Sequence, residues 1–285
     1  MKNIIVIILL LLLIANFSYR IDLKKPHYEL VGELMYFPSG VALKALSMGF
    51  YAPLADLIWL RFIQYYGEHR LTDYKFEYLY HILDILTTLN PQFLHAYYLG
   101  SLMLTHDAQR PEQAKMLLKK GMKANPDNWP LPFYYGFIHF VFLKEYNIAK
   151  TYFRISAMKP DAPIMPKRWA AFTAYKRLGD LKTALVLWLD LYNNTENPEE
   201  KAIAELYIKD IKMELDIQFL NKKIKEFTEK FGSKPDNLKE LITHKLISSI
   251  PAEPHGENYY IKNEKVYSTY KHDWQIWQKP RRTKK

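Results

Sequence analysis

The sequence contains no cysteine, and glycine is scarce, with 10 among 285 residues. The first absence excludes disulfide bonds, thiolate metal ligands and a cysteine nucleophile. It leaves the compartment open, because an exported protein can do without disulfides. The glycines are spread along the chain, so the sequence has no glycine-rich loop of the kind that binds phosphate.

Residue patterns that carry chemistry are also missing. The nine histidines are scattered, and none belongs to a His-Glu-x-x-His pattern. Glu68 and His69 form an isolated pair that is more typical of a helix surface than of a metal site. We therefore assign no catalytic, cofactor-binding or metal-ligating residue, and we expect a protein that is not an enzyme.

The chain is basic, with a formal charge of +10 at pH 7, which raises nucleic acid as a partner. Lys and Glu are interleaved along the expected helices without a single basic stripe, so we expect no nucleic-acid partner. The one clear basic run is residues 279–285. This run is typical of a solvated tail, and contact with anionic lipid headgroups is the alternative.

The N-terminus is strongly apolar, since residues 4–15 are twelve consecutive apolar side chains. A cleaved signal peptide has a basic start and an apolar run of about 7–15 residues, which are present, and a small-x-small exit, which is poor here. A spanning helix needs roughly 17–20 apolar residues. We interpret residues 1–19 as an uncleaved signal-anchor, with a cleaved signal peptide as the alternative.

The charges that flank this segment bear on its orientation in the membrane. Arg20, Lys24 and Lys25 follow the apolar run and only Lys2 and the α-amino group precede it, which favours the reverse topology when counted literally. A helix that begins at residue 4 nevertheless inserts most simply as a signal-anchor. We therefore expect a bacterial-type inner-membrane protein with the bulk of the chain in the periplasm.

Small residues recur with a period of about 35 through the middle of the chain. Ala114, Ala149 and Ala184 are each 35 residues apart. Prolines and glycines keep nearly the same spacing, and they are Pro91, Pro126 and Pro160, and Gly67, Gly100 and Gly136. A period of about 34 residues is typical of a repeated helix pair.

These repeats resemble the tetratricopeptide (TPR) family, in which small residues lie where two helices cross, large ones fill between them and a proline closes each unit. The best match is Gly100, Ala114, Leu118, Gly121 and Pro126. The next unit has Gly136, Ala149, Phe153, Ser156 and Pro160. A third has Gly179, Ala184 and Trp188 but departs at Leu191, and an earlier degenerate one has Gly67, Leu79, Leu83, Leu86 and Pro91. The resemblance implies an all-α helical solenoid over residues 55–197.

The rest of the chain divides around these repeats. Residues 20–54 are expected to be a spacer and a lead-in helix. Residues 198–231 contain only one proline and no glycine and keep apolar residues at helical spacing, which predicts one long capping helix or two short ones in line. In residues 232–278, short runs at 259–261 and 265–267 predict a small hairpin and hence a small α+β end.

A second resemblance lies in that end. Pro235, Leu238 and Leu241 are followed by Glu253-Pro254-His255-Gly256 and by Tyr259. This pattern is similar to the globular tail of type II secretion pseudopilins, with Glu253 in place of the usual acid. The N-terminus lacks the pilin processing signature, so we do not expect a filament subunit.

The TPR register also predicts a binding surface. In that family the first helices of the pairs line the concave face, which implies an apolar groove for a protein partner. The residues placed there are Tyr97, Phe133, Phe137, Phe140 and Trp169, with Lys176 and Arg177 at one end. The alternative is that these aromatic side chains are core.

Three functions fit this organisation. The first is a membrane-anchored extracytoplasmic TPR scaffold for protein–protein interaction, in assembly of an envelope apparatus such as a pilus or secretion system. The second is a soluble periplasmic peptide- or protein-binding module. The third is an accessory subunit of an envelope enzyme complex, with catalysis in the partner.

Overall fold

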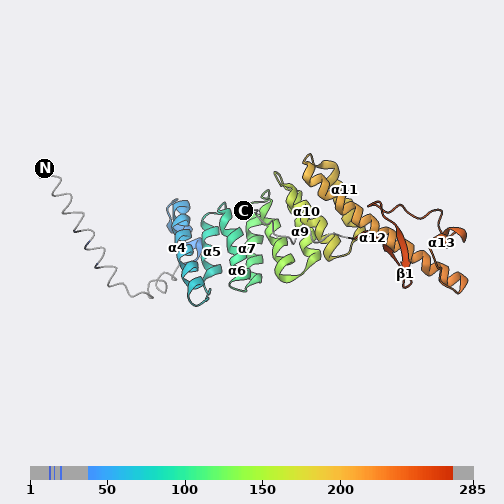
Figure 1. The fold of residues 1–285 in the computed structure, drawn as a ribbon. Coiled ribbons are helices and arrows are strands. Elements are labelled where there is room, and N and C mark those ends of the chain that lie inside the picture. Colours follow the sequence, from blue (N-terminus) through green and yellow to red (C-terminus); the bar gives the residue numbers. More distant parts are fainter. Residues whose placement is uncertain (1–12, 14–15, 17–19, 21–37, 272–285) are drawn as a thin grey trace, which may run out of the picture. The chain divides into compact units, whose positions relative to one another are not determined.

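The computed structural model describes residues 13, 16, 20 and 38–271, and the protein is mostly α, with 68% helix. About 10 packed helices are followed by a small two-strand hairpin near the C-terminus (Figure 1). Within the described part of the chain, no helix combines the length and apolar character needed to cross a bilayer. The expected signal-anchor at residues 1–19, apart from residues 13 and 16, and the basic tail at 279–285 lie outside the described residues.

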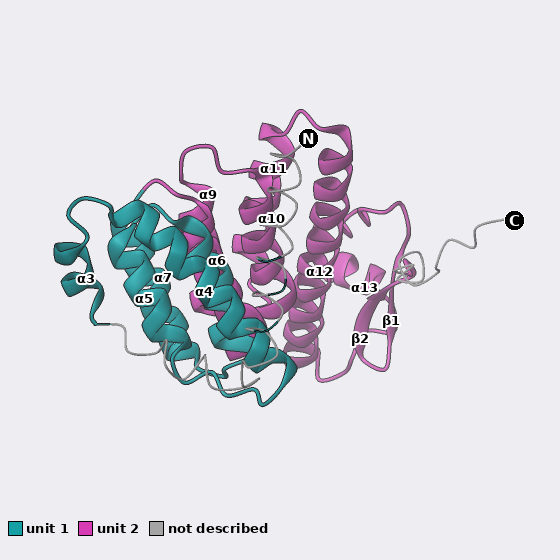
Figure 2. Ribbon diagram, turned by 90° about the vertical axis from the view of Figure 1, so that its left-hand side faces the viewer, with its two compact units in different colours: residues 1–126 teal, residues 127–285 magenta. Residues whose placement is uncertain are grey.

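The chain separates into two compact units, residues 1–126 and 127–285 (Figure 2). The boundary falls inside the expected repeat region 55–197. Unit 1 consists of α3 (Gly40–Leu46), α4 (Tyr51–Leu71), α5 (Leu79–Leu89), α6 (Leu94–His106) and α7 (Pro111–Ala124). Helices that follow one another from α4 to α7 pack together. Fully buried side chains between them include Phe62, Leu79, Leu83, Leu86, Tyr97, Leu104, Leu117 and Leu118.

Unit 2 likewise consists of helices that pack on their neighbours in the sequence, and it ends in the hairpin. Its first part consists of α8 (Pro130–Ile138), η1 (His139–Leu143), α9 (Tyr146–Ala157), α10 (Ile164–Phe172), η2 (Thr173–Arg177) and α11 (Leu181–Asn194). Its second part consists of α12 (Pro198–Phe231), α13 (Lys239–Thr243), β1 (Tyr259–Lys262) and β2 (Lys265–Ser268). The segments η1 and η2 are π-helical turns that extend α8 and α10.

The small-residue spacing corresponds to helix packing, as predicted. Ala114, Ala149 and Ala184 lie in α7, α9 and α11, the second helix of each pair, and all are fully buried. The large residue four positions later is also buried in each case, as Leu118, Phe153 and Trp188. Small residues therefore allow close approach between helices, while the large residues fill the space beside them.

The glycines divide into two kinds. A Cβ on Gly100 would lie 2.7 Å from Leu83, and one on Gly136 would lie 3.0 Å from the Phe153 ring. Both positions are close helix crossings, as the TPR resemblance implies. Gly67 is different, because a Cβ there would meet no atom within 4 Å.

A second 35-residue period appears in the backbone. Tyr74, Gln109, Lys144 and Gly179 all have left-handed backbone conformation, with φ of 56°, 53°, 59° and 63°. Each follows the first helix of a pair and reverses the chain into the second. In three of these turns, a backbone N–H donates to the carbonyl six residues earlier in the chain. The bonds run from Arg110 to Leu104, from Glu145 to His139 and from Asp180 to Ala174. The repeated unit is therefore a helix, a left-handed turn and a second helix.

The expected capping helix is a single helix, α12. Asn197 accepts from the N–H of Glu199 at 2.9 Å, Pro198 occupies the first turn, and Gly232 ends the helix with φ of 73°. The first half of α12 packs on α11 through Ala204, Ile208 and Ile211. Its second half packs through Leu220, Ile224 and Phe227 on the C-terminal segment.

The C-terminal segment contains the hairpin predicted at residues 259–267. β1 and β2 pair antiparallel, with Tyr260 opposite Tyr267. Glu253, 7% exposed, accepts from the N–H groups of His255 and Glu257 and from the Ser268 hydroxyl. The acidic residue of the turn therefore orders the chain that leads into the hairpin.

Candidate aromatic pocket

The structure brings four of the expected groove residues together in unit 2. Phe133, Phe137 and Phe140 recur at helical spacing along α8 and η1, so their rings lie on one face. Trp169 from α10 lies against them, with ring centroids 6.1, 5.8 and 5.1 Å from those of Phe133, Phe137 and Phe140. These distances are typical of aromatic pairs that stabilise one another.

A pocket of about 530 Å³ adjoins this cluster. We call it the aromatic pocket, and it is formed by η1, α10, α11 and α12, all within unit 2. Its lining residues are Phe140, Met165, Arg168, Trp169, Phe172, Trp188 and Tyr207. This volume and an apolar lining with few polar groups are typical of a ligand site.

Two of the expected residues, Phe140 and Trp169, line the aromatic pocket. Phe133 is 7% exposed and contacts Phe153, so it belongs to the core beneath the cluster. Phe137 is half-buried and contributes to the ring cluster.

Tyr97 is a correction to the expected groove. It lies in α6 of unit 1 and is fully buried, so its ring fills the core there and presents no surface. Burial raises the pKa of its phenol to about 12. The glycine-based alignment placed this side chain in the groove, whereas the structure buries it in the core.

Five lining residues were not identified from the sequence, namely Met165, Arg168, Phe172, Trp188 and Tyr207. Three of them lie on α10 at positions 165, 168 and 172, which with Trp169 form one helical face. This spacing could have been read from the sequence. Tyr207 could not, because it comes from α12 and reaches the pocket only through the packing of that helix on α11.

Trp188 is the most buried residue of the lining, at 2% exposed. Its ring stacks on that of Tyr207, with centroids 4.3 Å apart and 12° between the planes. Among the described residues, no acceptor lies within hydrogen-bonding distance of its indole N–H. A buried donor without an acceptor is costly.

One basic side chain, Arg168, is among the residues that line the pocket. Arg168 pairs with Glu200 at 2.7 Å, and Lys167 pairs with Asp190 at 3.1 Å. The guanidinium of Arg177 lies 5.3 Å from the Phe140 ring centroid, within the range of a cation–π contact. Arg177, one of the two expected cationic residues, therefore contacts a ring that lines the aromatic pocket.

Lys176 contacts a different ring from the one that Arg177 contacts. Its ammonium is 3.8 Å from the ring centroid of Tyr175. Burial lowers the pKa of Lys176 below its usual range, although Glu214 and Asp210 oppose that effect. Tyr175 donates to Glu214 at 2.5 Å, and burial followed by this bond raises the pKa of the phenol. Lys176 thus lies within electrostatic reach of Glu214 and Asp210 on α12.

Both π-helical turns of unit 2 contribute to the site. η1 carries Phe140 and η2 carries Arg177, and the turns are 34 residues apart. In each, an N–H bonds to the carbonyl five residues earlier, from Lys144 to His139 and from Leu178 to Thr173. A π-helical turn changes the direction of the side chains that follow it and is frequent at functional sites.

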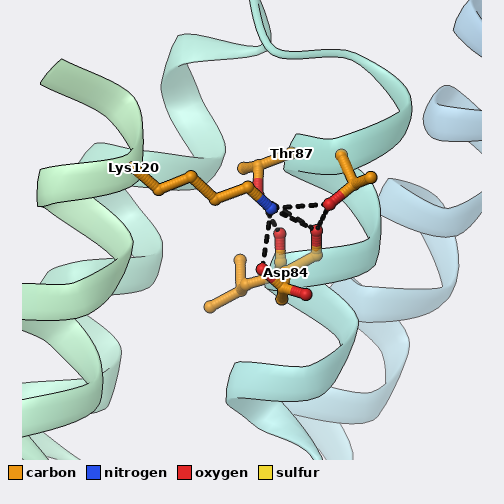
Figure 3. Close-up of polar contacts among 5 residues, drawn as sticks. Asp84, Thr87 and Lys120 are labelled. Carbon is orange, nitrogen blue, oxygen red and sulfur yellow. Dashed lines mark hydrogen bonds and ion pairs between the residues drawn. The ribbon is translucent and has the colours of Figure 1, made fainter. Parts of the chain in front are cut away.

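A polar cluster in unit 1 joins two of its helices. Lys120 on α7 donates to the Asp84 carboxylate at 2.7 Å, to the Asp84 carbonyl at 2.8 Å and to the Thr88 hydroxyl at 2.6 Å (Figure 3). This contact joins α7 to α5 within unit 1. Over residues 38–271, no group of three His, Cys, Asp or Glu side chains is placed to hold a metal ion.

Comparison with protein-family models finds no match to this sequence. Comparison with curated proteins finds no relative either.

Proposed function

We propose that this protein is a scaffold that holds a segment of a partner protein in the aromatic pocket of unit 2. The observation that carries the proposal is the pocket of about 530 Å³, in which aromatic side chains from four helical segments converge beside Arg168. Large aromatic side chains in partly desolvated pockets supply much of the binding energy at protein interfaces.

The helix-pair repeat supports this proposal. We infer that the repeats are of the TPR kind, because buried alanines and close glycine crossings recur with the period typical of that family. In a stack of helix pairs, the first helices share one surface, and such surfaces bind protein segments. Two of the elements that line the aromatic pocket, η1 and α10, belong to the first helices of successive pairs.

We further propose that the scaffold is anchored in a bacterial-type inner membrane and works in the periplasm. The support is the apolar run at residues 4–15. The pseudopilin-like end favours a role in assembling an envelope apparatus such as a pilus or secretion system. Glu253, which is buried and accepts three hydrogen bonds beside the hairpin, is the residue that supports that likeness.

Capture from solubilised membranes tests the binding function. A tagged parent chain is compared with Met165→Asp, which places a charge in the aromatic pocket, and with Met158→Asp, the same change at an exposed site outside it. We expect a discrete set of proteins with the parent and with Met158→Asp, and loss of that set with Met165→Asp. Retention of the same proteins by both variants would show that the pocket is not the binding site.

Membrane fractionation with mass determination of the mature N-terminus tests the anchor. An intact N-terminus in the membrane fraction supports the anchored scaffold. A shortened chain in the soluble periplasmic fraction supports the alternative, a soluble binding module. The third alternative is an accessory subunit of an envelope enzyme. In that case the complex captured from solubilised membranes would show enzymatic activity.

A further inference from the structure

We infer that the corner between α3 and α4 enters the headgroup region of the bilayer to which residues 4–15 are proposed to anchor the chain. The corner consists of residues 41–51 in unit 1. The inference rests on the proposed anchor and adds a second contact with the same lipid surface. It does not involve the aromatic pocket, so the two sites can be tested separately.

Large apolar side chains protrude from this corner. In the described part of the chain, six such side chains are more than 70% exposed, and four of the six belong to the corner. These four are Val41 at 72%, Leu46 at 71%, Met48 at 90% and Phe50 at 71%. Single exposed apolar residues are ordinary on a protein surface, whereas a group of them marks a surface that contacts a membrane or another protein.

The rest of unit 1 holds the corner in place. Gly40 is buried where α3 packs on α5, and a Cβ there would lie 2.8 Å from the Thr88 side chain (Figure 2). After α3, Met48 has left-handed backbone conformation with φ of 50°, and the Phe50 N–H donates to the Ser47 carbonyl at 2.8 Å. The apolar side chains are therefore presented by a formed turn, and their insertion requires little further ordering.

The charge of the corner suits a lipid surface. Residues 38–55 contain one charged side chain, Lys44, and no acidic one. A lysine can extend its ammonium to the headgroups while its methylene groups remain in apolar surroundings. The Lys44 ammonium lies 5.5 Å from the ring centroid of Tyr51, and tyrosine is enriched at the level of the headgroups. An acidic side chain would oppose entry into the bilayer.

The position of the first carboxylate limits the depth of the contact. Asp56 is the first acidic residue after the corner, about 7 Å along α4 from Tyr51 at the rise of an α-helix. Segments that lie in the interface of a bilayer are buried to about 5–10 Å. The uncharged corner therefore has the dimension of a shallow, interfacial contact.

The place of the corner in the sequence favours lipid over other occupants. Only residues 16–40 separate it from the apolar run, and a chain of that length reaches at most about 80 Å when fully extended. An anchored chain therefore keeps the corner close to the bilayer, where even a weak contact forms because it is intramolecular in effect. A second copy of the chain or a soluble partner has no such tether.

The test uses the absence of cysteine from the sequence. The full-length chain receives one cysteine at a time, as Met48→Cys in the corner, as Leu10→Cys in the apolar run, or as Met158→Cys. The last is the matched control, because Met158 is 74% exposed and lies in unit 2. Each variant is labelled with a nitrobenzoxadiazole dye and reconstituted into vesicles of phosphatidylethanolamine and phosphatidylglycerol, with or without bromine on the acyl chains.

We expect the dye on Met48→Cys to emit at shorter wavelength than the dye on Met158→Cys and to lose intensity in brominated vesicles. We expect the dye on Met158→Cys to be insensitive to bromine. Leu46→Cys repeats the measurement at a second exposed site of the corner, and we expect the same result as for Met48→Cys.

Each other outcome has a definite meaning. Quenching of Leu10→Cys without quenching of Met48→Cys and Leu46→Cys would overturn the lipid contact and leave the anchor standing. The reverse result would support the lipid contact and overturn the anchor. A dye on Met48→Cys that emits at shorter wavelength but is not quenched would show that protein covers the corner, and would overturn the inference. Equal quenching of Met48→Cys and Met158→Cys would show unspecific adsorption and would overturn it as well.

Discussion

Trp188 and Tyr207 stack with their ring centroids 4.3 Å apart and 12° between their planes. The pair joins α11 to α12 and also lines the aromatic pocket. The long helix is thus more than a cover for the apolar face of the preceding helix pair. It supplies one side chain to the proposed binding surface, so the stability of this end of the stack and the shape of the pocket depend on the same contact.

Replacement of Tyr207 by Leu should lower the free energy of unfolding by about 1 kcal/mol, because the aromatic pair is lost while an apolar side chain remains. Tyr207→Phe is the matched control, since it retains the ring and its stacking on Trp188. Thermal unfolding followed by circular dichroism measures both. Equal destabilisation by the two substitutions would mean that the hydroxyl, and not the stacking, contributes the stability.

The close crossing at Gly100 predicts opposite effects for two Gly→Ala substitutions in unit 1. Gly100→Ala places a methyl group 2.7 Å from the buried Leu83 and should cost about 1–3 kcal/mol through overpacking. Gly67→Ala places the methyl in open space within α4 and should stabilise by about 0.5–1 kcal/mol. Chemical denaturation of the two variants checks the signs, and stabilisation by both would contradict the crossing.

The contact between α5 and α7 should contribute measurable stability to unit 1. Lys120→Met removes the donor to Asp84 and Thr88 and should cost about 1 kcal/mol, since the ion pair is partly exposed but leaves three acceptors without this donor. Lys123→Met, a change of the same type at an exposed position of α7, should shift stability by less than about 0.5 kcal/mol. Urea unfolding at low salt compares them, and equal effects would contradict the role of Lys120.

The Tyr259–Asp216 hydrogen bond of 3.0 Å predicts a pH-dependent effect. Burial raises the pKa of the Asp216 carboxyl above its ordinary value, and the Tyr259 hydroxyl opposes that rise by donating to the ionised form. Stability from this group is therefore fully present below the unfolded-state pKa and is lost as pH rises through the raised folded-state pKa. Tyr259→Phe should enlarge that loss.

The measurement is the difference in unfolding free energy between the parent and Tyr259→Phe at pH 3 and pH 7. We expect a difference of about 1.5–3 kcal/mol at pH 7, where the carboxylate accepts the bond, and a smaller one at pH 3. A difference that is the same at both values would show that Asp216 does not ionise in this range. A carboxyl-carbon NMR titration would show the further rise of the Asp216 pKa directly.

The helix pairs could be predicted from the sequence because their packing depends on residue size. Only small side chains fit at the closest crossings, so Ala114, Ala149 and Ala184 reveal the period directly. The left-handed turns could not be found in this way. Three of the four, Tyr74, Gln109 and Lys144, are not glycine, and their conformation is imposed by the hydrogen bonds that end the preceding helix.

The proposed binding surface was predictable only in part, for a different reason. Helical spacing placed Phe133, Phe137 and Phe140 on one face of α8 and η1, because that face is set by the period of the helix. It could not distinguish Phe140, which lines the pocket, from Tyr97, which fills the core of unit 1. That distinction depends on which neighbouring helices cover each ring, and Tyr207 comes from a helix that the repeat pattern does not include.

Site-specific photo-crosslinking in intact cells tests the central claim, that the aromatic pocket holds a partner protein. Benzoylphenylalanine is placed at Met165, which lines the pocket and is 36% exposed, and separately at Met158, which is 74% exposed and lies outside the pocket. We predict a discrete protein adduct from position 165 and none from position 158. An adduct of equal yield at both positions, or none at position 165 in a chain that folds as the parent does, would contradict the claim.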